Sequence, residues 1–174
     1  MKLSNWISLL LGCWAFSPAL AQQKPPENDK EFEEAYDWRI RQEYLYEVYI
    51  PKDLTDAFIQ LNKLIEKPAI EKFKNMPEAD AARKLHFSFG RWIIHNWGFY
   101  GGSRFSHFLK GLGIHHPDDM AQFVIVSYHR NLNRKPLDVK TQITYYQEKR
   151  EKENEERLKK GAVLHEEVRK KKKE

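Results

Sequence analysis

The stretch from Leu85 to Trp97 most constrains how this chain can fold. At 100° per residue its large apolar side chains occupy a very wide arc of a helix surface. That arc consists of Leu85, Phe87, Phe89, Trp92, Ile93, Ile94 and Trp97. A helix that is apolar over most of its circumference must be surrounded by other elements. The sequence therefore predicts a buried aromatic helix from Pro77 to about Trp97, ended by Gly98.

The flanking segments also carry helical signals. Helices are expected over residues 30–48, 54–65, 68–75, 77–97, 103–112 and from 117, with a last helix beginning near 138. Asp53 and Ser103 are suited to cap two of these helices, and Pro117 occupies a favoured first position. No segment shows convincing period-two alternation bounded by turns. The predicted fold is all-α, a compact multi-helix domain around the buried aromatic helix.

The helix expected from Pro117 is also apolar nearly all round. Its side chains include Met120, Phe123, Val124, Ile125 and Val126. The helix expected from 138 is different, because beyond Gln147 apolar residues lose their periodicity and Glu–Lys or Glu–Arg pairs four residues apart replace them. We expect the first of these helices to be buried and the second to continue as a long charged helix in solvent.

The N-terminus has the pattern of a secretory signal peptide. Lys2 supplies the positive charge, residues 6–16 the apolar segment, and Ala19-Leu20-Ala21 a small-residue cleavage site. The expected organisation is a signal peptide (1–21), a linker and N-terminal helix (22–48), a helical domain (49–147) and a charged helical tail (148–174). The protein is therefore predicted to be exported, to the periplasm or outside the cell.

An alternative is lipoprotein processing, because Leu10-Leu11-Gly12-Cys13 resembles a lipobox that would anchor the chain at Cys13. If the chain is instead cleaved after Ala21, the mature protein has no cysteine and must be held together by core packing. No other stretch approaches the roughly 20 apolar residues that span a bilayer, so no transmembrane segment is expected.

A polar strip and a glycine-rich turn form the first candidate site. Ser88, Arg91 and His95 fall on the one strip of the central helix that is not apolar. Gly101, Gly102 and Ser103 then lead into a helix whose backbone N–H groups, with Arg104, can bind a carboxylate or phosphate. The alternative is a tight connection in which the glycines adopt positive φ and Ser103 caps the helix.

The histidines raise the question of a metal site. His86 and His95 lie on opposite sides of a helix and cannot share an ion, and His86 is interpreted as a buried, hydrogen-bonded core residue. His115, His116 and Asp118 carry suitable donor atoms, but adjacent ligands at a helix start lack the usual spacing. They are weak metal candidates with helix capping as the alternative, and no cofactor is predicted.

Catalysis and nucleic-acid binding have less support. The serines lack a nucleophile-elbow context, which leaves a hydrolase using His107, His116 and Asp118, with or without a metal, as the alternative function. From Glu148 onward the chain has 11 Lys and Arg against 8 Asp and Glu, a mixed rather than basic stretch. No nucleic-acid binding is therefore expected, although Lys170 to Lys173 can weakly contact an anionic membrane surface.

Several of these features together resemble a family of uncharacterised bacterial proteins described as a domain of unknown function. The resemblance rests on Pro51-Lys52-Asp53-Leu54, Gly90-Arg91-Trp92, Asn96-Trp97-Gly98, Gly101-Gly102-Ser103-Arg104, His116-Pro117-Asp118-Asp119-Met120 and Ser127-Tyr128-His129-Arg130. It implies a shared fold and no known activity, substrate or cofactor. The chain departs from the family at Ile94-His95, where a more basic pair is expected.

These observations favour a small exported binding module over an enzyme. The predicted partner is a protein or a small anionic ligand, bound through Arg91 and Arg104 near the Gly101-Gly102-Ser103 turn. A hydrolase and a structural envelope protein remain as alternatives.

Overall fold

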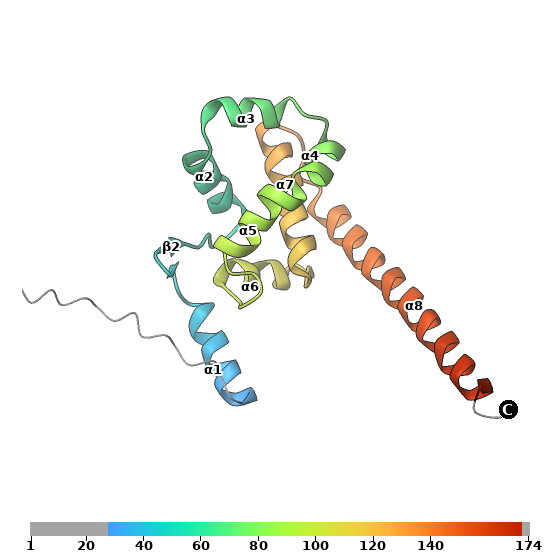
Figure 1. Ribbon diagram of the computed structural model, residues 1–174. Coiled ribbons are helices and arrows are strands. Elements are labelled where there is room, and N and C mark those ends of the chain that lie inside the picture. Colours follow the sequence, from blue (N-terminus) through green and yellow to red (C-terminus); the bar gives the residue numbers. More distant parts are fainter. Residues whose placement is uncertain (1–27, 172–174) are drawn as a thin grey trace, which may run out of the picture.

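The computed structural model describes residues 28–171, with side chains from 28 to 161. The predicted signal peptide, the lipobox at Cys13, most of the linker, and Lys172 and Lys173 lie outside the described residues. Within the described part the chain is predominantly helical, which confirms the all-α class. Figure 1 shows a compact body from which the last helix projects.

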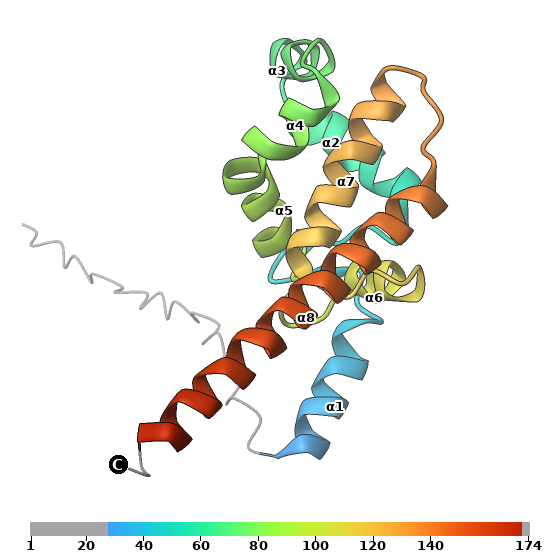
Figure 2. The same cartoon turned by 90° about the vertical axis from the view of Figure 1, so that its right-hand side faces the viewer.

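The centre of the body is helix α7, Pro117–Leu132. Most of its residues from Asp119 to His129 are fully enclosed, as the all-round apolar pattern predicts. The elements α2 (Leu54–Leu64), α3 (Lys67–Lys74), α4 (Glu78–Lys84), the π-helical turn η1 (His86–Gly90), α5 (Arg91–Asn96), α6 (Arg104–Gly111) and α8 (Val139–Lys171) all contact it. Figure 2 shows α7 between these elements. The element that the others surround is thus α7.

The predicted helix over residues 30–48 is wrong in its second half. Helix α1 spans Asp29–Arg39, and a hairpin of β1 (Tyr44–Leu45) and β2 (Val48–Tyr49) follows. Tyr46 and Glu47 form its two-residue turn with φ of 50° and 67°. Such a turn usually carries Asn-Gly or Asp-Gly, so the sequence contains no recognisable signal for it.

The predicted continuous helix from Pro77 to Trp97 is also interrupted. In η1 the N–H of Gly90 donates to the carbonyl of Leu85 at 2.9 Å, five residues back rather than four. This wider turn shifts the register of the residues after it, so one helical wheel cannot describe the whole segment. Phe87, predicted to be buried, is 77% exposed, whereas Ile93, Ile94 and Trp97 are buried as predicted.

A buried carboxylate attaches α8 to α7. Asp119 accepts hydrogen bonds from Nζ of Lys149 at 3.1 Å and from Nη2 of Arg150 at 2.8 Å, while Nε of Arg150 donates to its other oxygen. Burial alone would raise the pKa of Asp119, but these cationic donors outweigh it and hold the pKa below its usual value. The side chains of Ile143 and Tyr146 add apolar contact with the core.

Across residues 28–171, no helix is both long enough and apolar enough to cross a bilayer.

We predict that Asp119→Asn destabilises the protein at neutral pH by about 2 kcal/mol, because it removes charge-assisted hydrogen bonds to Lys149 and Arg150. The pKa of Asp119 is lower in the folded state, so its stabilising effect is present above the unfolded pKa of about 4 and is lost as pH falls through the folded value. The variant should therefore lose less stability than the wild type between about pH 5 and pH 2. Urea denaturation across this pH range measures both effects, and parallel pH profiles would contradict the assignment.

Candidate functional site

The glycine-rich turn after α5 leads into α6, and two of the backbone N–H groups there are bonded within the protein. Ser103 caps α6 and forms a capping box with Ser106, in which each side chain accepts from the other residue's backbone N–H. Both serines are fully buried. Because these N–H groups have protein partners, the turn matches the tight, capped connection rather than an open anion site.

Helix α1 covers the outer side of this turn. The ring of Tyr36 lies so close to Gly102 that a Cβ there would be 2.4 Å from it, and Gly102 has a φ of 87°. Nε of Arg39 donates to the carbonyl of Gly101 at 2.7 Å. The hydroxyl of Tyr36 lies 3.2 Å from Nδ1 of His107. These contacts attach α1 to the domain although α1 has no fully buried residue.

Arg104 has a structural environment. Its Nε donates to the carbonyl of Ile50 at 2.7 Å, and Nη2 lies 3.8 Å from Glu43 and 4.0 Å from Asp56. The guanidinium also lies 5.1 Å from the ring centre of Tyr49. Arg104 thus ties α6 to the hairpin and α2.

The carboxylate of Asp56 is an acidic neighbour of the Arg104 guanidinium. Burial would raise its pKa, but hydrogen bonds from the backbone of Lys52 and the hydroxyl of Tyr49 outweigh burial and lower it. The Tyr49–Asp56 hydrogen bond raises the pKa of Tyr49. Asp56 is therefore an ionised partner for Arg104 at neutral pH.

The polar strip on η1 and α5 is exposed as predicted. Ser88, Arg91 and His95 all lie at the surface. Ser88 makes only a long contact to its own helix, 3.5 Å from Oγ to the carbonyl of Leu85. Within the described residues, the side chains of Arg91 and His95 have no hydrogen bond or ion pair. Arg91 is thus the arginine of the predicted pair that is available to a ligand.

A cavity of about 720 Å³ lies where α1, the hairpin and the end of α5 meet. Three predicted site residues, His95, Gly101 and Gly102, line it. The other lining residues are Phe32, Arg39, Leu45, Tyr46, Val48, Ile94, Asn96, Gly98 and Tyr100. Neither Arg91 nor Arg104 lines the cavity, although Arg91 precedes His95 by one turn on the same strip.

Exposed aromatic rings surround this cavity. Tyr46 is 86% exposed, Tyr100 74% and Phe32 54%. Sequence analysis did not identify these residues, because they lie on three separate segments that only the folded chain brings together. Of these three residues, only Tyr100 could have been identified from the sequence, because it directly precedes Gly101 of the predicted turn. The cavity combines aromatic walls with a cationic edge, which suits binding rather than bond cleavage.

The histidine candidates lie elsewhere, at the start of α7. His116 caps this helix, its Nδ1 accepting from the N–H of Asp118 at 3.2 Å. Asp118 lies between two imidazoles, 3.6 Å from Nδ1 of His116 and 3.7 Å from Nε2 of His86. The interpretation of His86 as a hydrogen-bonded core residue is wrong, because its Nδ1 is buried without a hydrogen bond and the side chain is 15% exposed.

The metal and catalytic candidates do not converge on one centre. His115 is exposed, and His107 lies on α6 beside Tyr36 rather than near Asp118. Among the described residues, no three His, Cys, Asp or Glu side chains are grouped so that they could hold a metal ion.

Residues 50–132 match the model of a protein family described as "Domain of unknown function (DUF6794)". The match confirms the resemblance to a domain-of-unknown-function family and covers the body from the end of the hairpin to the end of α7. Comparison of the chain with curated proteins and with solved structures gave no match.

We predict that the two arginines of the anion site expected from the sequence differ in their effect on stability. Arg104→Ala should lower the free energy of unfolding by about 2 kcal/mol, because the buried carbonyl of Ile50 loses its donor and Asp56 loses its cation. Arg91→Ala should change it by less than about 0.5 kcal/mol, since that side chain is exposed and unpaired. Chemical denaturation of both variants measures the difference, and equal stabilities would contradict the structural role of Arg104.

We also predict that Gly102→Ala loosens α1. The added Cβ would overlap the ring of Tyr36, and positive φ disfavours alanine by about 1 kcal/mol or more. Limited proteolysis should then cleave the α1 region faster than in the wild type. Gly101→Ala is the control, because its Cβ would be 3.8 Å from the nearest atom, Nε of Arg39. Equal cleavage of the two variants would show that Tyr36 does not hold α1 in place.

Proposed function

We propose that this domain of unknown function, together with α1 and the hairpin, is a binding module that holds an apolar, acidic segment of a partner protein. The observation that carries the proposal is the ring of exposed aromatic side chains, Phe32, Tyr46 and Tyr100, around a cavity of about 720 Å³. Large aromatic side chains gathered at one cavity are a recurrent feature of protein interaction sites.

The charge of the proposed site argues for carboxylates in the partner segment. Arg39 is the charged residue of the cavity wall, and His95 lies beside it. Arg91, one turn before His95, adds an exposed cation that has no partner among the described residues. A partner segment that enters between the aromatic rings can therefore place an Asp or Glu against these groups.

A polypeptide segment fits this site better than a small anion. The capping box of α6 engages the N–H groups of Ser103 and Ser106, and Arg104 donates to the carbonyl of Ile50 and lies 4.0 Å from Asp56. The aromatic walls offer apolar area that a phosphate or carboxylate alone would not use. The affinity should therefore come mainly from the rings, with Arg91 contributing to attraction and orientation.

We also propose that the module acts outside the cytoplasm. This part of the proposal rests on Lys2, the apolar segment 6–16 and the Ala19-Leu20-Ala21 site, which together are typical of a signal peptide.

Random peptides displayed on phage test the binding site. The wild-type protein should enrich peptides with aromatic or aliphatic residues next to Asp or Glu. Synthetic versions of these peptides should bind Tyr100→Ala at least about tenfold more weakly, because a central aromatic contact is lost. Arg91→Ala should weaken binding less, and its effect should shrink at high salt.

Tyr145→Ala is the matched control. Tyr145 is 61% exposed on α8 and does not line the cavity. Fluorescence polarisation with labelled peptides gives the dissociation constants. Enriched peptides that bind wild type, Tyr100→Ala and Tyr145→Ala equally would overturn the proposed site.

A further inference from the structure

The outer part of α8 has no intramolecular support. From Glu151 to Gly161 every side chain is exposed, and no atom outside the helix backbone lies within 4 Å of the position a Cβ would take at Gly161. Figures 1 and 2 show the helix leaving the body along a straight path. Most helical stability in proteins comes from packing of one face, and this stretch packs no face against the body, so it is a candidate for contact with a partner.

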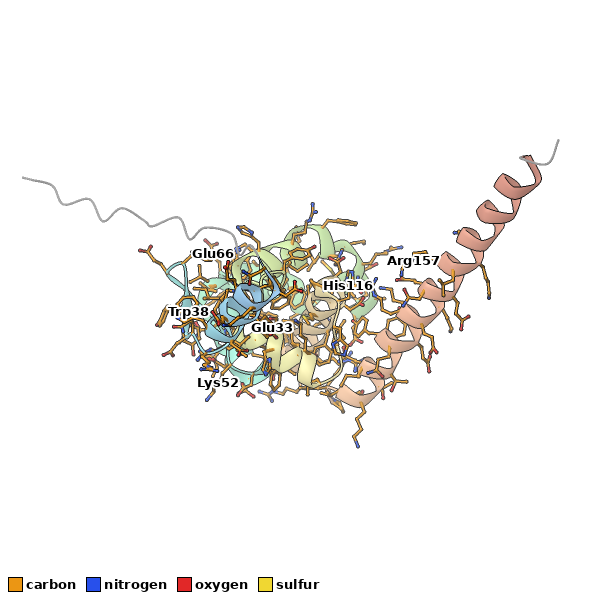
Figure 3. All side chains as sticks on the ribbon, turned by 90° about the horizontal axis from the view of Figure 1, so that it is seen from below. Glu33, Trp38, Lys52, Glu66, His116 and Arg157 are labelled. Carbon is orange, nitrogen blue, oxygen red and sulfur yellow. The ribbon has the colours of Figure 1, made fainter. Side chains whose placement is uncertain are left out.

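A crevice opens where α8 leaves the body. It has a volume of about 620 Å³ and lies between the segment 113–117 and one face of α8. Ile114, Pro117, Tyr146 and Leu158 form apolar walls, and Leu158 is 71% exposed. Figure 3 shows His116 at the edge of the body nearest α8 and Arg157 on the projecting helix. The crevice thus has one wall on the body and one on the helix.

The α8 wall is acidic. Glu151 and Glu155 line the crevice, and the stretch 148–156 contains five Glu. Of its three basic residues, Lys149 and Arg150 are bound to Asp119, which leaves Lys152. An occupant of this crevice should therefore be basic, with small or apolar residues for the walls.

The far end of the same helix has the complementary composition. Residues 157–171 contain six Lys and Arg against two Glu, and Gly161 to Leu164 is an uncharged block; Lys172 and Lys173 follow in the sequence. An acidic stretch at 148–156 and a basic C-terminal end on one helix suit pairing with an identical helix in the antiparallel direction. Intramolecular pairing is prevented because α8 is continuous to Lys171.

We propose that the crevice receives the C-terminal half of α8 from a second copy of this chain, forming an antiparallel, two-fold symmetric dimer. A two-fold axis beside Gly161 and Ala162 places the crevice-face residues Asn154 and Leu158 opposite Arg169 of the partner subunit and His165 of the partner subunit. The helices approach closely at the axis because Gly161 has no side chain. The symmetry makes each crevice accept the basic end of the other helix.

The lengths of the elements fit this arrangement. With the two-fold axis beside Gly161, the end of the partner's helix lies opposite Glu151. The projecting parts of the two helices therefore overlap over their whole length. The two bodies then lie at opposite ends of the helix pair. Gln147, Glu151, Asn154 and Leu158 share the crevice face at helical spacing, and Gly161 continues it. This face is mostly polar, so the association depends on charge and is salt-sensitive.

Sedimentation analysis of the full chain at several salt concentrations tests the dimer. We expect a dimer at high protein concentration and low salt that dissociates at about 0.5 M salt. Glu151→Lys combined with Glu155→Lys should give a monomer under the same conditions. Glu66→Lys combined with Glu71→Lys is the control, because it makes the same charge change at two exposed positions, the N-cap of α3 and a residue within α3.

Cysteine cross-linking tests the position of the axis. In a chain carrying Cys13→Ser, Gly161→Cys should form a disulfide-linked dimer under mild oxidation, because the two positions meet at the axis. Glu156→Cys should not, because it lies more than one turn from the axis in each helix. A monomer at all concentrations, a dimer indifferent to salt, or equal cross-linking at both positions would overturn the proposal.

Discussion

The burial of α7 between Asp119 and His129 is the constraint on which the rest of the structure depends. A helix that is apolar over most of its circumference is not stable exposed to water, so other elements must cover it. Apart from α8, the surrounding elements are short, and each covers one part of its circumference. Their order along the chain follows from this requirement, because consecutive short helices with tight connections can pass around one central rod.

Charged contacts attach the covering elements at defined positions. Asp119 holds α8 through Lys149 and Arg150, and Glu78 on α4 accepts a bidentate pair from Arg130 near the other end of α7. The hydrogen bond from Arg130 lowers the pKa of Glu78, so both contacts are formed at neutral pH and weaken in acid. Apolar burial drives the helices together, and these directional pairs select their arrangement.

Both proposed binding surfaces lie where the matched family domain meets segments outside it. The aromatic cavity lies between residues 94–102 of the domain and residues of α1 and the hairpin, which precede the match. The crevice lies between residues 113–119 and α8, which follows the match. The central body is thus a support on which the two flanking segments create cavities, and the specificity of this chain is expected to reside in those segments.

The sequence by itself determined the features that depend on neighbours along the chain. The caps at Asp53 and Ser103, the end of α5 at Gly98, the burial of α7 and the exposed strip of Arg91 and His95 all follow from local geometry and helical period. Only the tertiary structure decided the π-helical turn, the Tyr46-Glu47 hairpin turn, the structural role of Arg104 and the meeting of Phe32, Tyr46 and Tyr100. Each of these features depends on residues distant in sequence, whose packing can offset a locally unfavourable backbone or bind a charge that local pattern leaves free.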